Sequence, residues 1–446
     1  MASLADSLKD GAVPAPDPAS AAGPVPRDAD RPRAMAFYVL ALLCLISLLG
    51  YYDRYLVAIL AESIKHDLGV SDGQIGLLTG FAFAFVYSIM AVPVARYSDG
   101  GRRVLVLGVS LLIWSAMTAL CGLAPGFAVL LAARLGVGLG EAGGIPTTHA
   151  LVSDYFPARW RTTALSATVV IGGIGFMIAN AAGGWIADNW GWRAAFLVGA
   201  VPAPFLALLL FATVREPVLP DRAVGTAPKG IWRSVRSLLA RRSYALLCLG
   251  VAVATVASAA TLNWMPAFLM RTHGLTAGQV GGSYGLIMGL STIIALLVGG
   301  VLGDALFRLN PRWGIYLPAL AFMGAMPLTL AFLFAQDLTM ALFIAAPMTV
   351  MASLAITPAY ALVQRLAGAG NRATATALYL LIVNLFGMGS GPAVAGWISD
   401  ALASEFGRES LKYALALISS AYLAGGLLIA CGARSVAHDS AAADAA

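Results

Sequence analysis

Long apolar stretches separated by short polar segments make up most of the chain from Ala34 onward. Most of them approach the roughly 20 residues that an α-helix needs to cross the hydrocarbon core of a bilayer. The pattern predicts an all-α membrane protein with twelve membrane-spanning helices, six in each half of the chain. The expected spans are 34–60, 73–96, 103–123, 127–152, 161–187, 193–214, 243–270, 277–303, 312–335, 338–363, 372–400 and 411–432.

Three polar segments divide the chain. Residues 1–33 are rich in Ala, Pro and Asp and lack the layout of a cleaved signal peptide, so we expect a disordered cytoplasmic tail. Two six-helix bundles are expected over 34–214 and 243–432, and a second cytoplasmic tail over 433–446.

The linker over 215–242 alternates apolar and basic residues. Ile231, Val235, Leu238 and Leu239 would share one helical face, with Arg233, Arg236, Arg241 and Arg242 among them. This pattern fits a short helix that lies on the inner leaflet and contacts anionic lipids. A solvated basic linker is the alternative.

The loops that join the expected spans differ in charge. With the N-terminus placed in the cytoplasm, 21 of the 28 Lys and Arg residues fall in cytoplasmic segments and five in outer segments. Cytoplasmic loops of membrane proteins carry such an excess of positive charge. We therefore expect a multi-pass inner-membrane protein with both termini in the cytoplasm.

Composition narrows the possible functions. Only 11% of the residues are charged and 59% are hydrophobic, so a soluble enzyme or a nucleic-acid-binding protein is disfavoured. The four Cys and four His residues show no ligand spacing, and we expect neither a metal nor a cofactor. Apparent GxGxxG and GxSxG motifs at 138–143 and 281–285 lie inside spans, where glycines that allow close helix contact explain them better than an enzyme site.

The two halves of the chain repeat one another. Shifted by 205 residues, Gly73-Gln74-Ile75-Gly76 falls on Gly278-Gln279-Val280-Gly281, and Asp99 falls on Asp304. Shifted by 212 residues, the segment Gly184-Trp185-Ile186-Ala187-Asp188 falls on Gly396-Trp397-Ile398-Ser399-Asp400. Two parallel six-helix halves with a binding site between them are typical of transporters that work by alternating access.

These features resemble the major facilitator superfamily over about 34–432. Asp99 with Arg102 and Arg103 matches the charged loop between its second and third spans, and Asp304 with Arg308 is the equivalent in the second half. The segment Arg134 to Ala142 is similar to its arginine- and glycine-containing motif in the fourth span. The resemblance implies a fold of two pseudo-symmetric six-helix bundles. It also suggests that Asp99, Arg102, Arg103, Asp304 and Arg308 act as gates.

A narrower resemblance is to bacterial homologues of the Spinster family of sphingolipid and lysolipid transporters. It rests on Tyr51-Tyr52-Asp53-Arg54-Tyr55, on Gly138 to Ala142, and on Asp154-Tyr155-Phe156 with Arg161. The resemblance implies an amphipathic anionic substrate, such as a lysophospholipid or a sphingolipid-like molecule.

Four charged residues lie inside the expected spans: Asp53, Arg54, Arg134 and Glu141. A charge near the bilayer centre costs about 2.5–3.5 kcal/mol even on lenient scales. At ~1.5 Å per residue, Asp53 and Arg134 both lie ~10 Å below the outer face and can meet, and Glu141 lies ~10 Å deeper on the side of Arg134. Asp53 and Arg54 are adjacent and about 100° apart around the helix, so we expect them to have different partners.

These charges predict how the protein works. Arg54 and Arg134 are expected to bind an anionic head group, because a guanidinium can bond two oxygens at once. Asp53 or Glu141 would carry an exchangeable proton, since protonation leaves a surplus positive charge that can hold an anion. The alternative is an ion-paired quartet that only fixes helix packing. Further candidates for the substrate site are Tyr52, Asn263, Trp264, Tyr379 and Asn384, for which ordinary hydrogen bonding between helices is the alternative role.

The sequence therefore predicts a monomeric, proton-coupled secondary transporter and not an enzyme. Its expected partners are an amphipathic anion, protons and anionic membrane lipids. A proton-coupled porter of small hydrophilic organic anions is the alternative function.

Overall fold

The computed structural model describes residues 34–216, 231–310, 312–368, 371–436 and 439, and these residues form helices without a β-strand. The expected tail over 1–33 lies outside this part of the chain, as does most of the tail expected over 433–446. The linker residues 217–230 lie outside it too.

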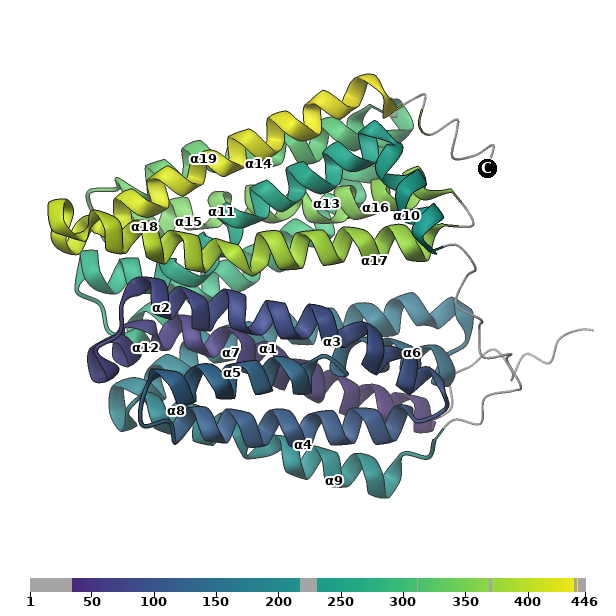
Figure 1. The fold of residues 1–446 in the computed structure, drawn as a ribbon, viewed down its shortest axis with the longest axis horizontal. Helices are drawn as coiled ribbons and strands as arrows, with labels where there is room; N and C mark the ends of the chain where they lie inside the picture. Colours follow the sequence, from purple (N-terminus) through teal and green to yellow (C-terminus); the bar gives the residue numbers. More distant parts are fainter. Residues whose placement is uncertain (1–33, 217–230, 311, 369–370, 437–438, 440–446) are drawn as a thin grey trace, which may run out of the picture.

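The first half contains nine α-helices that make six crossings (Figure 1). In chain order they are α1 (Ala34–Leu68), α2 (Asp72–Gly76), α3 (Ala82–Asp99), α4 (Arg103–Gly122), α5 (Phe127–Glu141), α6 (Gly144–Tyr155), α7 (Ala158–Trp190), α8 (Trp192–Ala200) and α9 (Pro202–Thr213). A π-helical turn, η2 (Leu77–Phe81), joins α2 to α3 within one crossing. The fourth and sixth crossings consist of α5 with α6 and α8 with α9.

The second half repeats this plan after α10 (Ile231–Ala240), a helix in the linker where the sequence predicts a short amphipathic one. Its helices are α11 (Arg242–His273), α12 (Ala277–Val280), α13 (Leu286–Leu309), α14 (Trp313–Leu333), α15 (Leu338–Leu354), α16 (Ile356–Ala367), α17 (Arg372–Ile382), α18 (Ser390–Phe406) and α19 (Ser410–Cys431). The π-helical turn η3 (Gly281–Gly285) joins α12 to α13, and η4 (Val383–Met388) lies between α17 and α18.

The described residues contain eleven continuous stretches long and apolar enough to cross a membrane. The last stretch, Thr374–Arg434, is 61 residues long and includes the final two predicted spans. Gly407, with a φ of +51°, and the 3₁₀ turn Gly407–Glu409 separate α18 from α19 within it. The twelve predicted crossings are therefore present, although many helices extend several residues beyond the predicted bounds.

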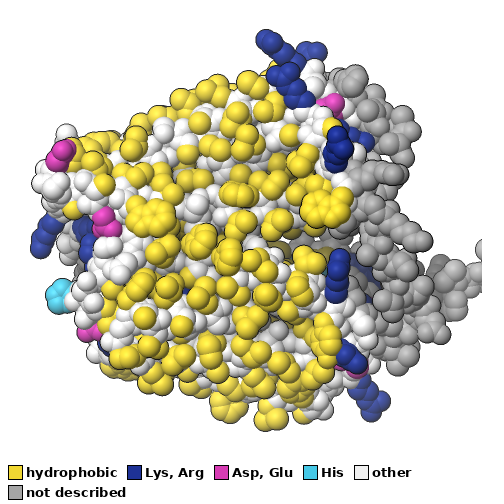
Figure 2. Space-filling model, viewed as in Figure 1, with side chains coloured by type: hydrophobic (Ala, Val, Ile, Leu, Met, Phe, Trp, Pro, Cys, Tyr) yellow, Lys and Arg dark blue, Asp and Glu magenta, His cyan; other side chains and the backbone are white. Residues whose placement is uncertain are grey.

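The two halves lie side by side as helical bundles, and apolar side chains cover the middle of the face in Figure 2. Large apolar side chains are exposed on both halves, among them Leu208 of α9 and Phe343 of α15. We call the end that carries Arg102, Arg161 and the start of α17 the basic end, and the other end, where α2 and α12 begin, the opposite end.

The repeat detected in the sequence is visible at the start of α2 and α12. Ser71 and Gln74 form a capping box, in which each side chain accepts the backbone N–H of the other residue. Thr276 and Gln279 form the same capping box before α12. Capping boxes satisfy N–H groups that a helix leaves free at its first turn. Gln74 and Gln279 therefore have the same structural role in the two halves.

Glycines allow two long helices of the second half, α11 and α19, to touch. A Cβ atom added at Gly425 of α19 would lie 2.4 Å from the carbonyl oxygen of Gly250 on α11. A Cβ atom added at Gly250 would in turn lie 2.7 Å from the carbonyl oxygen of Gly425. The backbones approach closely here because neither residue has a side chain.

We predict that Gly425→Ala lowers the stability of the protein by about 1–3 kcal/mol, because the added methyl group meets backbone atoms that cannot rotate away. Thermal unfolding in detergent, followed by intrinsic fluorescence, should show a midpoint several degrees lower. Gly282→Ala is the matched control, since nothing lies within 4 Å of the added atom. Equal midpoints for the two variants would contradict this packing argument.

Candidate functional site

The four charged residues predicted within the spans lie on two helices of the first half, and their side chains meet between these helices. Asp53 and Arg54 are in α1, and Arg134 and Glu141 are in α5. Asp53, Arg134 and Glu141 are 2%, 0% and 4% exposed, and 20% of the Arg54 side chain is exposed. A buried charge is stable only with partners close by, so their contacts define the site.

Arg54 and Glu141 form one ion pair. The Nη2 atom of Arg54 donates a hydrogen bond of 2.7 Å to Oε2 of Glu141. The guanidinium carbon lies 4.7 Å from the ring centre of Phe83 and 5.3 Å from that of Tyr87. Arg54 is therefore held by a carboxylate and by the faces of aromatic rings, both of which attract a cation.

Asp53 has different partners, as the spacing around the helix predicts. Its Oδ2 atom accepts hydrogen bonds from Nε1 of Trp114 and Oγ1 of Thr118, which lie one turn apart on α4. The Nη1 atom of Arg134 donates to the backbone carbonyl of Asp53 at 3.5 Å. Within the described residues, Oδ1 of Asp53 and the Nε and Nη2 atoms of Arg134 have no hydrogen-bond partner. The two buried side chains therefore neighbour each other and keep unused polar atoms.

Glycines of α5 bring the surrounding helices to these charges. A Cβ atom at Gly140 would lie 2.6 Å from the backbone nitrogen of Trp114, and one at Gly138 would lie 2.9 Å from the carbonyl oxygen of Phe83. Without a side chain at these positions, α4 and α3 approach close enough to place Trp114 and Phe83 beside the charges. The interpretation of this glycine motif as a helix-contact motif is confirmed.

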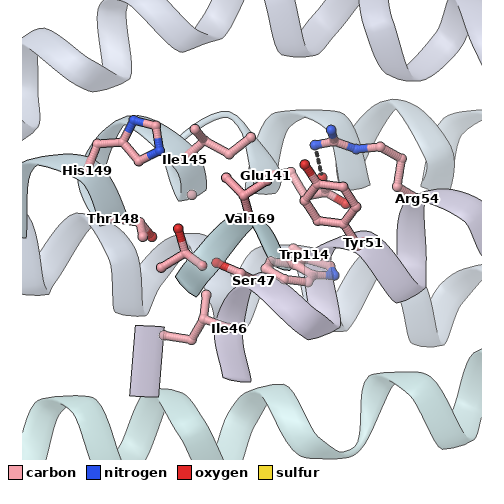
Figure 3. Close-up of a pocket in the computed structure, with 13 residues that line it drawn as sticks. Ile46, Ser47, Tyr51, Arg54, Trp114, Glu141, Ile145, Thr148, His149 and Val169 are labelled. Carbon is pink, nitrogen blue, oxygen red and sulfur yellow. Dashed lines mark hydrogen bonds and ion pairs between the residues drawn. The ribbon is translucent and has the colours of Figure 1, made fainter. Parts of the chain in front are cut away.

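A cavity of about 180 Å³ lies in the first half and is lined partly by Arg54 and Glu141. Figure 3 shows Arg54, Glu141 and Tyr51 at one end of this group and His149 at the other. The remaining wall mixes apolar and hydroxyl-bearing side chains from α1, α6 and α7, with Trp114 from α4: Ile46, Ser47, Ile145, Thr148, Thr168 and Val169. The cavity thus offers a cation, hydroxyl groups and an apolar surface within a small volume.

Other predicted substrate residues lie elsewhere. Tyr52 donates a hydrogen bond to the Ala195 carbonyl, and Trp264 donates one to the Pro392 carbonyl. The Asn263 side chain bonds the Ala259 carbonyl one turn earlier in its own helix. These three side chains and Tyr379 are buried in helix packing, Asn384 is half-buried in η4, and none of the five lines this cavity. Arg134 does not line it either.

The residues predicted to act as gates lie at the basic end. Arg103 pairs with Asp154 of its own half, and its backbone N–H donates to Glu216. The Arg102 guanidinium lies 4.9 Å from the ring centre of Tyr97. The Asp99 side chain lies outside the part of the structure that is described.

The equivalent gate residues of the second half lie in α13. Asp304 lies 3.5 Å from Arg365, also within its own half, and Arg308 is exposed. Arg103 and Asp304 therefore each pair with a residue of their own half.

Sequence reasoning missed the two side chains that hold Asp53. Trp114 and Thr118 are four residues apart on one helical face, and this spacing of polar groups in an apolar span was the available signal. It also missed Ser47 and Thr168 in the cavity wall. In the described residues, no three His, Cys, Asp or Glu side chains gather as metal ligands would.

Comparisons with known proteins agree with this architecture. Residues 43–392 match the Major Facilitator Superfamily. An MFS-type efflux pump of Mycolicibacterium smegmatis is 35% identical over 86% of this chain and 90% of its own length. Human protein spinster homolog 1 is 28% identical over 87% of this chain and 79% of its own length. A probable galactarate/D-glucarate transporter of Bacillus subtilis is 24% identical over 63% of this chain and 67% of its own length.

A solved structure is similar over nearly the whole chain. It is a bacterial homologue of the human lysosomal transporter Spinster in an inward-facing, unoccupied conformation. The TM-score is 0.78 and the identity 26%, and the match covers 92% of this chain and 98% of that one. The predicted resemblance to a bacterial Spinster homologue is thus confirmed.

We predict that Arg134→Met destabilises the protein by about 3–5 kcal/mol, because it leaves the buried Asp53 carboxylate without its neighbouring positive charge. Adding Asp53→Asn should recover much of this loss, since the amide oxygen can still accept from Trp114 or Thr118. Thermal unfolding of the single and double variants measures the coupling between the two side chains. The control is Arg193→Met, which removes an exposed pair with Asp67 and should change stability by less than about 1 kcal/mol. Additive effects of the two buried substitutions would contradict this coupling.

Proposed function

The chain belongs to the Major Facilitator Superfamily, and from this premise we propose that it transports an amphipathic anion by alternating access with proton coupling. The observation that carries the proposal is the Arg54–Glu141 pair in the wall of a cavity that has both polar and apolar sides. A cation in a cavity wall can bind an anion, and the protonation state of a neighbouring carboxylate can control whether the cation is available.

Arg54 is the proposed ligand of the anionic head group. Its Nη2 atom is committed to Glu141, whereas its Nε atom has no hydrogen-bond partner in the described part of the chain. When Glu141 takes up a proton, the ion pair loses its negative partner and the guanidinium can bind a phosphate or carboxylate through two parallel bonds. Anion binding and protonation of Glu141 then favour one another.

Asp53 and Arg134 form a second, fully buried unit behind this pair. The guanidinium carbon of Arg134 lies 5.8 Å from the ring centre of Phe83. The guanidinium carbon of Arg54 lies 4.7 Å from the same ring centre. We propose that Asp53 is the second site of proton exchange, and that Arg134 supports anion binding from behind this ring. A charge change at Asp53 would be felt at Arg54 because little water screens the interaction.

An amphipathic substrate fits the mixture of side chains around Arg54. Ile46, Ile145 and Val169 form an apolar surface that the apolar part of the substrate can contact. The resemblance to Spinster proteins favours a lysophospholipid-like or sphingolipid-like anion. The cavity volume of about 180 Å³ accommodates a head group, so an acyl chain would extend beyond it. Tyr52, Asn263, Trp264, Tyr379 and Asn384 would contribute only after the helices move.

A porter of small hydrophilic organic anions is the second candidate. The hydroxyl groups of Ser47, Thr148 and Thr168 in the small cavity favour it, as does the similarity to a probable galactarate/D-glucarate transporter. In this case the whole substrate would fit beside Arg54.

We further propose that the protein is a monomer of the bacterial inner membrane with its basic end in the cytoplasm. The α10 helix would then lie at the inner leaflet, where exposed Trp232 and Arg236 can meet lipid and anionic head groups. When the basic end closes, Asp99, Arg102 and Arg103 of the first half, with Asp304 and Arg308 of the second, would act as its gate.

We predict that the purified protein binds an anionic lysophospholipid or a sphingoid phosphate, and that Arg54→Ala weakens this binding by roughly tenfold to a hundredfold, the value of a hydrogen bond to a charged group. Isothermal titration with these lipids, D-glucarate and an uncharged monoacylglycerol measures the affinities and shows which chemical class of substrate binds. Arg193→Ala is the control, since Arg193 is half-exposed and does not line the cavity, and this variant should bind as the wild type does. Binding of D-glucarate without binding of either lipid would overturn the lipid assignment and favour the second candidate.

We predict that Asp53→Asn and Glu141→Gln keep substrate binding but lose pH-dependent transport, because each imitates a carboxylate that holds its proton permanently. Uptake into proteoliposomes, measured with and without a pH gradient, tests both variants. Asp67→Asn changes an exposed carboxylate and serves as the control. If both buried variants respond to the gradient as the wild type does, neither carboxylate alone is the proton carrier, and the quartet has a structural role.

A further inference from the structure

The two halves meet tightly at the opposite end along two lines of contact. Along the first, α2 of the first half packs against α18 of the second, and we call this the α2–α18 seam. Along the other, α7 of the first half packs against α12 of the second, and we call this the α7–α12 seam. The labels α2, α12 and α18 lie together at the left of Figure 1.

One aspartate crosses each seam. Asp400 of α18 accepts the backbone N–H of Asp72 at 2.9 Å and that of Gly73 at 2.8 Å. Asp188 of α7 accepts the backbone N–H of Ala277 at 3.1 Å and that of Gly278 at 2.8 Å. In both cases one carboxylate from one half receives two N–H groups from the other half, each on a different oxygen.

Glycines one helical turn before these aspartates allow the backbones of the two halves to touch. A Cβ atom at Gly396 would lie 2.3 Å from the Asp72 carbonyl oxygen, and one at Gly184 would lie 2.4 Å from the Ala277 carbonyl oxygen. Gly184 and Gly396 each lie four residues before the aspartate of their own seam. The repeated segment Gly-Trp-Ile-Ala/Ser-Asp is thus a unit in which the glycine permits contact and the aspartate bonds across it.

The seams differ in what surrounds the aspartate. At the α2–α18 seam the Asp72 side chain itself is a partner: Arg271 of the second half binds it at 2.7 Å through both Nη1 and Nη2, and Ser399 donates to it at 2.7 Å. Lys65 of the first half binds it as well, at 2.5 Å. The equivalent residue at the α7–α12 seam is Ala277, which has no polar side chain. Arg271 and Ser399 therefore bond across the α2–α18 seam in addition to Asp400, whereas in the described residues Asp188 is the only side chain that bonds across the α7–α12 seam.

We propose that Asp188 and Asp400 are paired positioning residues that hold the opposite end closed, and that the α7–α12 seam, where within the described residues Asp188 alone accepts hydrogen bonds from the other half, is the weaker of the two. Both carboxylates lie at the end of the bundle, Asp188 on the exposed surface, so water can replace their partners when the halves separate. Such bonds are strong enough to favour the closed state and can still be broken in each cycle.

The proposal rests on alternating access but not on the identity of the substrate, so its test uses the full-length protein without any ligand. Ser47 lines the cavity, and Ser47→Cys serves as the reporter in a background where Cys44, Cys121, Cys248 and Cys431 are replaced by Ala. A membrane-impermeant maleimide, added separately from each side of oriented vesicles, measures access from the basic end and from the opposite end.

Asp188→Ala should raise the ratio of labelling from the opposite end to labelling from the basic end by about tenfold or more, the effect of losing one or two hydrogen bonds to a charged group. Asp400→Ala should change the ratio in the same direction but less, because Arg271 and Ser399 still bind Asp72. Asp188→Asn keeps one acceptor oxygen and should give a smaller shift than Asp188→Ala, so it tests the proposal even if the alanine variant does not fold.

Asp337→Ala is the matched control. Asp337 also accepts a backbone N–H, from Met340 at 2.7 Å, but within its own half. It should leave the labelling ratio unchanged. A wild-type ratio in both Asp188 variants would overturn the proposal, and so would labelling that rises equally from both sides, which indicates local loosening. A larger change of the labelling ratio in Asp400→Ala than in Asp188→Ala would contradict the proposal that the α7–α12 seam is the weaker one.

Discussion

Charge neutrality inside an apolar interior is the constraint on which the centre of this protein depends. Asp53, Arg134 and Glu141 are almost completely excluded from solvent, and Arg54 reaches only the edge of a small cavity. With all four ionised the group is neutral, and the loss of any one charge leaves a partner buried without compensation. Any proton or anion that enters this region must therefore be balanced by another change within it.

The contacts divide this neutral group into two units, one at the cavity wall and one fully buried. Arg54 and Glu141 share a direct ion pair at the cavity, where an incoming anion can compete for the guanidinium. Asp53 is held by Trp114 and Thr118 on α4, and its neighbour Arg134 is fully buried. Both units use residues of α1 and α5, so a rotation or shift of α1 changes them together. In the proposed mechanism, this arrangement links protonation, anion binding and helix position.

The sequence predicts much of this arrangement because periodicity and depth are local quantities. Apolar runs place the spans, and the rise per residue correctly puts Asp53 near Arg134. The rotation of about 100° between adjacent residues of a helix explains why Arg54 has a different partner. The rotation of each helix about its axis depends on packing against helices distant in sequence, so the wall of the cavity could not be derived in the same way. Tyr52 and Trp264, for example, are polar residues within spans whose side chains bond backbone carbonyls between packed helices. The spacing of Trp114 and Thr118 marks one polar face of α4, but the sequence alone does not show that this face meets Asp53.

The two kinds of charged contact differ in how readily they can be exchanged. The carboxylates of Asp188 and Asp400 lie at the end of the bundle, where water can take over the hydrogen bonds of the seams when the halves part. The central carboxylates have no such replacement, because helices surround them. Separation of the halves at the opposite end is therefore limited by the strength of the seams, whereas the centre can change only when a proton or an anion arrives. The bonds of the seams connect the halves, whereas the central ion pairs lie within the first half. Ligand exchange at the centre can therefore reach the α7–α12 seam through movement of α1, because α1 packs along α7.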